Sequence, residues 1–210
     1  MKRYQQILGW LTLTACLGFL VSQLAVKFRT GSPSQAAVNL AESVTGDEFE
    51  FSLTSPRGTK IYSVNRLSEE MVQAIDRGFE TLFAVASSPP YNFSSALLHS
   101  DYTVFVAKPD RVVSKKGTYS PDVSVAAQQY RGSKYEENGR VPVAGMVLAF
   151  TPCAFVVAEH TKDFDRVASA VRHEGEHIVL YHNDRAFYER TADHSQGGGH
   201  PILKQPQPES

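Results

Sequence analysis

His173-Glu174-Gly175-Glu176-His177 is the most informative segment of this 210-residue chain. In a helix, residues four apart lie about 40° apart around the axis and one turn along it. Both imidazoles can therefore reach a single metal ion from one face of a helix. Glu174 follows the first histidine directly, where its carboxylate can take a proton from a water on that ion.

The residues around this segment predict that it is helical. Asp163 can cap the start of the helix. On a helical wheel, the apolar residues Val167, Val171 and Ile178 lie opposite the two histidines. We therefore expect the back of the helix to face a core and the histidines to face a cleft. Gly175 points in a third direction, where a neighbouring element can approach closely.

The pattern His-Glu-x-x-His resembles the active-site helix of the zincin metallopeptidases. In that family the two histidines bind zinc and the glutamate is the general base. The resemblance implies that His173 and His177 are zinc ligands and that Glu174 is the base. It also implies a zincin-like α+β fold, in which a small mixed or antiparallel sheet packs against the helix with the motif. The resemblance covers the motif and the strand-then-helix order before it.

The residues after His177 do not match the familiar spacings of a third zinc ligand. A metzincin-like chain would have glycine at 180 and histidine at 183, where this chain has Leu180 and Asn183. Four later residues remain as candidates: His182, Glu189, His194 and His200. We favour His194, because the glycine-rich segment 195–199 that follows it can fold back on a site.

Residues 1–30 predict a membrane-targeting segment. Lys2 and Arg3 precede an apolar run from Ile7 to Val26. A run of about 20 helical residues matches a hydrocarbon core of about 30 Å. We expect an uncleaved anchor, ahead of a cleaved signal peptide or a lipoprotein signal at Cys16. The rest of the chain would then lie outside the cytoplasm, either anchored to the membrane or secreted, for example to the periplasm.

The remaining sequence predicts one domain. Residues 31–46 are rich in Ser and Ala and are expected to form a linker, in which 36–44 could be a short helix. Residues 47–203 would be the metallopeptidase domain, and 204–210 a disordered tail. The net charge of −1 and the lack of a basic patch argue against a nucleic-acid partner.

Local patterns predict the elements of this domain. Alternating or apolar runs predict strands at 49–53, 60–64, 102–107, 144–150 and 154–158. Capping residues and apolar stripes predict helices at about 69–86, 164–181 and 185–192. Residues 111–140 are expected to form a long loop, which could wall the cleft or be disordered. Cys16 and Cys153 are the two cysteines, so a disulfide framework within the domain is excluded, and Cys153 is expected to be buried.

Together these features predict a zinc-dependent peptidase that hydrolyses peptide or protein substrates outside the cytoplasm. The alternative is a membrane-anchored binding or assembly protein, with a structural metal or with no metal and no turnover. A structural zinc needs four protein ligands and a closed site. The four histidines that could supply it are His173, His177, His194 and His200.

Overall fold

The structure, a computed structural model, describes residues 33–113, 119–126, 136, 138–192 and 201–204. The chain divides into two compact units, Met1–Ala36 and Ala37–Ser210. Apart from the first turn of helix α2, all described elements belong to the second unit. Within that described part there are four α-helices and eight strands, which confirms the α+β class.

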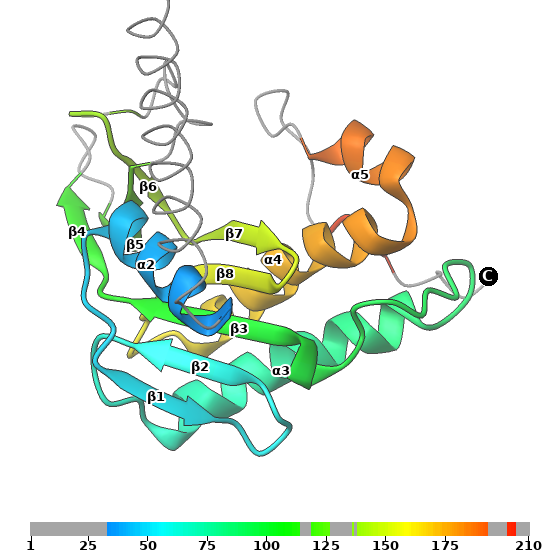
Figure 1. The fold of residues 1–210 in the computed structure, drawn as a ribbon, viewed down its shortest axis with the longest axis horizontal. Coiled ribbons are helices and arrows are strands. Elements are labelled where there is room, and N and C mark those ends of the chain that lie inside the picture. Colours follow the sequence, from blue (N-terminus) through cyan, green and yellow to red (C-terminus); the bar gives the residue numbers. More distant parts are fainter. Residues whose placement is uncertain (1–32, 114–118, 127–135, 137, 193–200, 205–210) are drawn as a thin grey trace, which may run out of the picture. The chain divides into compact units, whose positions relative to one another are not determined.

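A five-stranded mixed sheet forms the centre of the second unit (Figure 1). The strands lie in the order β1 (Phe51–Thr54), β2 (Lys60–Ser63), β3 (Tyr102–Ala107), β8 (Cys153–Ala158) and β7 (Gly145–Phe150). The three central strands are parallel, whereas β1 and β7 run antiparallel to their neighbours at the two edges. All five strands were predicted from the sequence, with bounds that differ by at most about two residues.

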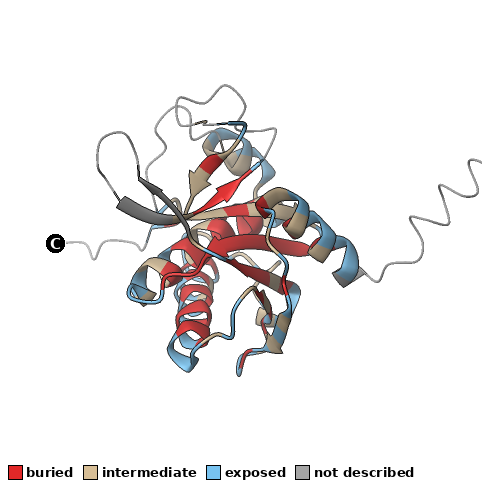
Figure 2. Cartoon of the chain, turned by 90° about the vertical axis from the view of Figure 1, so that its left-hand side faces the viewer, coloured by how far each residue is buried: buried red, intermediate tan, exposed pale blue. Residues whose placement is uncertain are grey.

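Helices cover both faces of this sheet. On β3, Val104 and Val106 face helices α3 (Glu69–Ala86) and α4 (Phe164–Asn183), whereas Phe105 and Ala107 face α2 (Pro33–Thr45) and β5. This division follows from the strand geometry, in which successive side chains point to opposite faces. Because both faces are covered, the strands β3 and β8 and the inner sides of the helices are buried (Figure 2).

The prediction of a linker at 31–46 was wrong for most of its length. Residues Pro33–Thr45 form helix α2, the short helix that the sequence left as an option. Ala37 and Ala41 lie one turn apart on that helix and are buried against the sheet. Burial of this small apolar face stabilises a helix that the composition alone does not predict.

The prediction of a long loop over 111–140 was also wrong for residues 111–113 and 119–125, which lie in strands. Strands β4 (Asp110–Val113), β5 (Tyr119–Val125) and β6 (Val141–Val143) form a second, antiparallel sheet. Val123 and Val125 of β5 are buried. Strand propensity depends strongly on partners across the sheet, and the local composition of this segment, in which Gly, Ser and Lys are frequent, favoured a loop.

Side-chain caps begin the helices as predicted. Ser68 accepts a hydrogen bond from Met71 N–H at the start of α3, and Asp163 accepts one from Arg166 N–H at the start of α4. Asp184 ends α4 and caps α5 (Arg185–Thr191). Helix α4 runs two residues beyond the predicted end at Tyr181, because the cap is Asp184 rather than an earlier residue.

The segments that the sequence assigned to the membrane and to the tail are mostly not described. Residues 1–30 and 205–210 lie outside the described residues. Among the helices of the described part, none combines the length and the hydrophobicity needed to cross a bilayer. Cys153 is a free, buried thiol, as expected, and burial raises its pKa to about 11.

Two glycines allow α3 and α4 to pack closely. A Cβ on Gly78 would lie 2.6 Å from the Ala168 carbonyl oxygen, and one on Gly175 would lie 2.6 Å from Leu82 Cδ2. The close approach predicted at Gly175 is thus confirmed. Backbone cannot retreat in a packed helix pair, whereas the tip of a leucine can change rotamer.

Replacing Gly78 with Ala is therefore expected to lower the free energy of unfolding by about 1–3 kcal/mol, in spite of the higher helix propensity of alanine. Gly175→Ala is the matched control, because it gains the same propensity but meets only a movable side chain. We expect it to be close to neutral. Chemical denaturation measures both, and equal stabilities of the two variants would contradict the backbone clash.

His160 follows β8 and is 3% exposed, with no hydrogen bond to either ring nitrogen in the described structure. Burial lowers its pKa, and the positive charge of Arg166 lowers it further, whereas Asp122 and Asp163 oppose the shift. The unfolded chain therefore binds a proton at His160 more readily than the folded one. The free energy of unfolding is therefore highest above about pH 6.5, the pKa of a histidine in the unfolded chain. It falls as the pH is lowered from there through the pKa of His160 in the folded protein.

His160→Leu is expected to reduce this acid destabilisation. No hydrogen-bond partner of His160 is stranded by the change, and leucine does not titrate. The measurement is the free energy of unfolding between pH 7.5 and pH 5, where the variant should lose less stability than the wild type. His99→Leu is a contrasting variant, because it removes the side-chain partner of Thr59 at 3.0 Å and the ion-pair partner of Asp76 at 3.4 Å, although Asp76 keeps the hydrogen bond from Ser55. If His160→Leu lost as much stability as the wild type between pH 7.5 and pH 5, His160 would not be the source of the acid destabilisation.

Candidate functional site

Helix α4 carries all three residues of the predicted motif. Its back is formed by Val167, Val171 and Ile178, which are fully buried against α3 and the sheet. The two histidines lie on consecutive turns of the other side, which is the phase predicted from the sequence. Packing on one face therefore fixes the direction in which the histidines point.

The two imidazoles lie edge to face. The ring centres of His173 and His177 are 4.9 Å apart, with an angle of 89° between the ring planes. His173 Nε2 lies 3.7 Å from Glu174 Oε1. The side chain of His173 is 26% exposed, whereas His177 and Glu174 are buried. The three groups therefore form one compact cluster that reaches the surface through His173.

Glu174 is enclosed by the edge strand β7. A Cβ on Gly145 would lie 2.8 Å from Glu174 Cγ and 2.9 Å from its Oε1, so only glycine leaves room for this carboxyl. Burial raises the pKa of Glu174 to about 8, and a hydrogen bond from the Val147 backbone opposes part of the shift. A desolvated carboxyl of this kind stabilises a cation placed beside it.

The residues of β7 that shape the site were not predicted. Gly145 lies inside the predicted strand, and a glycine within a strand pattern signals a close approach of another element. Strand β7 is also bulged between Val147 and Ala149, directly after the contact with Glu174. Bulges are common on edge strands and near active sites, where they redirect side chains. Gly145 was therefore a sequence signal from which this close approach could have been predicted. The bulge has no such signal in the sequence.

Glu176, on the same helical turn as the motif, binds the C-terminal segment. Glu176 is fully buried, and its carboxylate lies 3.2 Å from Arg172 Nε and accepts a hydrogen bond from Ile202 N–H at 2.9 Å. Arg172 also donates to the Leu203 carbonyl at 2.7 Å. Burial raises the pKa of Glu176, against the opposing effects of these donors. Glu176 is thus a structural carboxylate that is bound by Arg172 and by the C-terminal segment.

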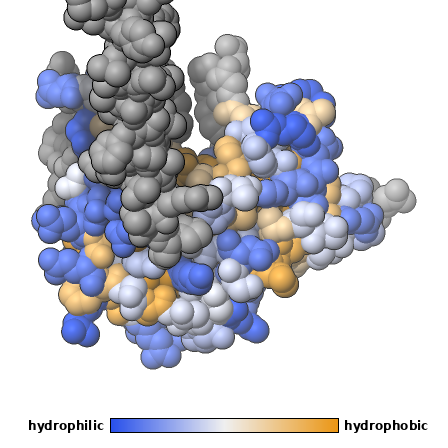
Figure 3. Space-filling model, viewed as in Figure 1, coloured by the Kyte–Doolittle hydropathy of each residue, from blue (hydrophilic) through white to orange (hydrophobic). Residues whose placement is uncertain are grey.

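An aromatic cluster adjoins the histidines at the end of α4. Phe150 at the end of β7 stacks on Tyr181 with ring centres 4.1 Å apart. Tyr188 of α5 lies edge to face against both Phe150 and His177, at 5.2 and 6.3 Å. Arg185 and Glu189 are exposed on the outer side of α5, which is largely hydrophilic in Figure 3. The cluster therefore joins β7, α4 and α5 beside the site.

Two of the four candidates for a third ligand are engaged elsewhere. His182 Nε2 lies 2.7 Å from the Phe150 carbonyl oxygen and 3.9 Å from Cys153 Sγ. Glu189 pairs with Arg185 at 3.1 Å on the surface. His194 and His200 lie outside the described residues. Within the described ranges, no group of three or more His, Cys, Asp or Glu side chains could hold a metal ion.

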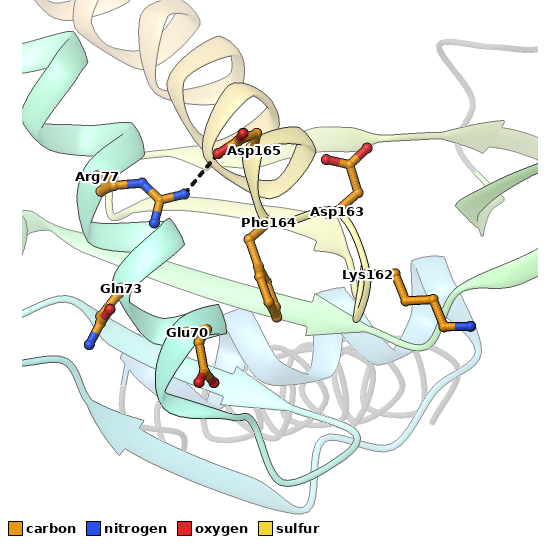
Figure 4. A pocket seen from close by; sticks show the side chains of 7 residues that line it. All are labelled: Glu70, Gln73, Arg77, Lys162, Asp163, Phe164 and Asp165. Atoms are coloured by element: carbon orange, nitrogen blue, oxygen red, sulfur yellow. Dashed lines mark hydrogen bonds and ion pairs between the residues drawn. The ribbon is translucent and has the colours of Figure 1, made fainter.

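A surface pocket lies away from the motif. It has a volume of about 370 Å³ and lies between the first turns of α3 and the start of α4 (Figure 4). Its lining residues are Glu70, Gln73, Arg77, Lys162, Asp163, Phe164 and Asp165. Charges of both signs line it, Arg77 pairs with Asp165 at 3.1 Å, and Asp163 caps α4. Arg77, Asp163 and Asp165 thus have structural partners, and none of the lining residues belongs to the motif.

Comparisons with models of known protein families, with curated proteins and with solved structures give no match. The assignment of the site therefore depends on the motif and on its surroundings in this fold. The observation that distinguishes it from a surface helix is the burial of Glu174 between the histidine turn and β7.

Proposed function

We propose that this chain is a zinc-dependent peptidase of the zincin type that acts outside the cytoplasm. The observation that carries the proposal is the position of Glu174, which is buried beside two histidines one turn apart and against Gly145 of an edge strand. In a surface helix that matches His-Glu-x-x-His by chance, the glutamate would be expected to point into solvent.

The donors near Glu174 suit a zinc ion. His173 and His177 supply two imidazoles at the spacing that zinc helices use, and a buried carboxyl beside them favours a cation. His194 remains the proposed third ligand, with His200 as the other candidate. When bound, zinc would polarise the scissile carbonyl and make a water molecule more acidic.

Glu174 performs the proton transfers in this proposal. Its carboxylate accepts a proton from the attacking water, and the same carboxyl later donates that proton to the leaving amine. Contact with Gly145 and the Val147 backbone keeps the carboxyl beside the histidines and away from bulk water. Exclusion of water strengthens the interactions of the charged form during the reaction.

Strand β7 provides a surface for an extended substrate. It is an antiparallel edge strand, so one side of its backbone has no neighbour in the main sheet. Ala144 accepts a hydrogen bond from Ala158 N–H, and bonding alternates along an antiparallel pair, so the backbone groups of Gly145 and Val147 face away from β8. The Val147 N–H already bonds to Glu174, so the proposed pairing uses the Gly145 groups and the Val147 carbonyl. A peptide that pairs with this edge would lie next to Glu174.

The test is the zinc content of the full-length protein, purified in mild detergent, together with cleavage of a mixed peptide library. We expect one zinc per chain, and peptide cleavage that a chelator stops and zinc restores. His177→Ala should lose both. His182→Ala is the matched control on the same helix and should retain both, because its ring bonds to the Phe150 carbonyl instead.

Each outcome separates the competing functions. No zinc in protein prepared without chelator, and none regained on addition, would overturn the proposal. Tightly held zinc without cleavage of any peptide would favour the structural-metal alternative, in which four protein ligands close the site.

A further inference from the structure

The C-terminal segment of residues 201–204 packs against the two long helices. Its Leu203 is fully buried. That side chain belongs to a buried cluster whose other members come from α3 and α4: Leu82, Val85, Ala86, Val179 and Leu180. The segment is therefore part of the core rather than a tail on the surface.

Two polar side chains of α4 bind the backbone of this segment. Glu176 accepts a hydrogen bond from Ile202 N–H at 2.9 Å, and Arg172 donates to the Leu203 carbonyl at 2.7 Å. The two side chains also bond to each other at 3.2 Å, so they act as one unit. Because these bonds reach the backbone, they fix the path of the chain itself.

A further bond extends the attachment to α3. Lys204 N–H donates to Tyr91 Oη at 3.1 Å, and Tyr91 lies in the loop that follows α3. Residues 202, 203 and 204 thus each have a backbone hydrogen bond to a different side chain. An irregular segment is usually poorly ordered unless it is tied down in this way.

The attached segment follows the proposed third ligand in the sequence. His194 and the alternative, His200, both come after helix α5 and before Ile202. The other end of this connection is held as well, because Tyr188 of α5 packs against His177 with ring centres 6.3 Å apart. A connection that is fixed at both ends has fewer conformations to lose when one of its residues binds a metal ion.

We propose that Arg172 and Glu176 are positioning residues of the zinc site. By holding residues 201–204 on the motif helix, they keep the preceding part of the chain within reach of His173 and His177, and so they raise the affinity for zinc. Neither side chain has to touch the ion. This inference rests on the proposed function.

The experiment measures the zinc dissociation constant of the full-length protein by competition with a chelator. Ile202→Pro removes the N–H that donates to Glu176 and leaves Arg172 beside that carboxylate. We expect zinc to bind about 10–100-fold more weakly, the usual effect of losing a residue that holds a ligand in place. Ile202→Val is the matched control, because it keeps the N–H and loses one methylene group. It should bind zinc as the wild type does.

Arg172→Lys tests the same attachment without a proline. Lysine keeps a positive charge beside Glu176, so the variant should fold. Its ammonium cannot reproduce the two directed bonds of a planar guanidinium, so the bond to the Leu203 carbonyl is lost. Zinc should again bind at least about 10-fold more weakly.

Gly78→Ala is the control for stability. It is expected to weaken the contact between α3 and Ala168, and it touches neither residues 201–204 nor the motif. With all variants measured at a temperature where circular dichroism shows them folded, Gly78→Ala should retain the zinc affinity of the wild type.

The outcomes distinguish this inference from the proposed function. Wild-type zinc affinity in the folded Ile202→Pro and Arg172→Lys variants would overturn the positioning role and leave the peptidase proposal intact. An equal loss of affinity in Gly78→Ala would also overturn the role, because the loss would then follow from stability alone. A wild-type protein that binds no zinc would overturn the proposed function and this inference with it.

Discussion

Glu174→Gln is expected to reduce kcat for peptide hydrolysis by about 10²–10⁴-fold, the usual contribution of a positioned general base. Glutamine has nearly the same shape as glutamate, so the packing against Gly145 is preserved. Its amide cannot accept a proton from water or return one to the leaving amine. The zinc content should stay the same, because the proposed ligands are His173 and His177 rather than Glu174.

The measurement is kcat on a quenched fluorescent peptide, with metal content determined on the same samples. Glu189→Gln is the matched control, because Glu189 is also a helical glutamate of this region but is exposed and paired with Arg185. We expect its kcat and its zinc content to equal those of the wild type. Full activity in Glu174→Gln at unchanged zinc content would exclude Glu174 as the base.

Features with local sequence signals were predicted well. The caps Ser68 and Asp163 bond within their own first turns, and the apolar back of α4 repeats every three to four residues. Strand β3 was predicted with its observed bounds because six residues rich in β-formers are followed by Lys108-Pro109. In each case the deciding interaction lies within one turn or one strand.

Features that depend on distant partners were missed. Strand β5 pairs with β6, where Val125 lies opposite Val141, and the composition of β5 did not separate it from a loop. The enclosure of Glu174 by Gly145 joins residues 29 positions apart, so the spacing within the motif carried no sign of it. Likewise, no pattern in the sequence connects Glu176 with Ile202. Register and tertiary packing settle such contacts, and no short window of sequence contains them.

The candidate zinc ligands were likewise predicted only where they lie on one helix. The spacing of His173 and His177 followed from helix geometry, and their rings do lie 4.9 Å apart. For a third ligand the sequence contains four candidate residues, but it does not show how far each lies from the two histidines. The structure engages His182 with the Phe150 carbonyl and Glu189 with Arg185, which leaves His194 and His200 as the proposals. Helix geometry predicts the relative positions of residues within one helix, but it does not predict where residues of the following segment lie.

The second large effect is expected from Arg172→Met, which should lower the free energy of unfolding by about 3 kcal/mol. Glu176 is fully buried, and Arg172 is its ion-pair partner at 3.2 Å. Methionine keeps the apolar stem of the side chain but leaves the carboxylate without a counter-charge, at a position where burial already raises its pKa. The variant also loses the hydrogen bond to the Leu203 carbonyl, which holds the C-terminal segment on α4.

An exposed pair on α5 is the comparison for the buried pair. Arg185 and Glu189 have the same residue types, the same spacing of four and nearly the same distance, 3.1 Å, but their side chains are 52% and 64% exposed. Exposed pairs contribute about 0–1 kcal/mol, so Arg185→Met should cost far less than Arg172→Met. Chemical denaturation of both variants measures the difference. If the two losses were equal, burial of the Arg172–Glu176 pair would add nothing to its contribution to the free energy of unfolding.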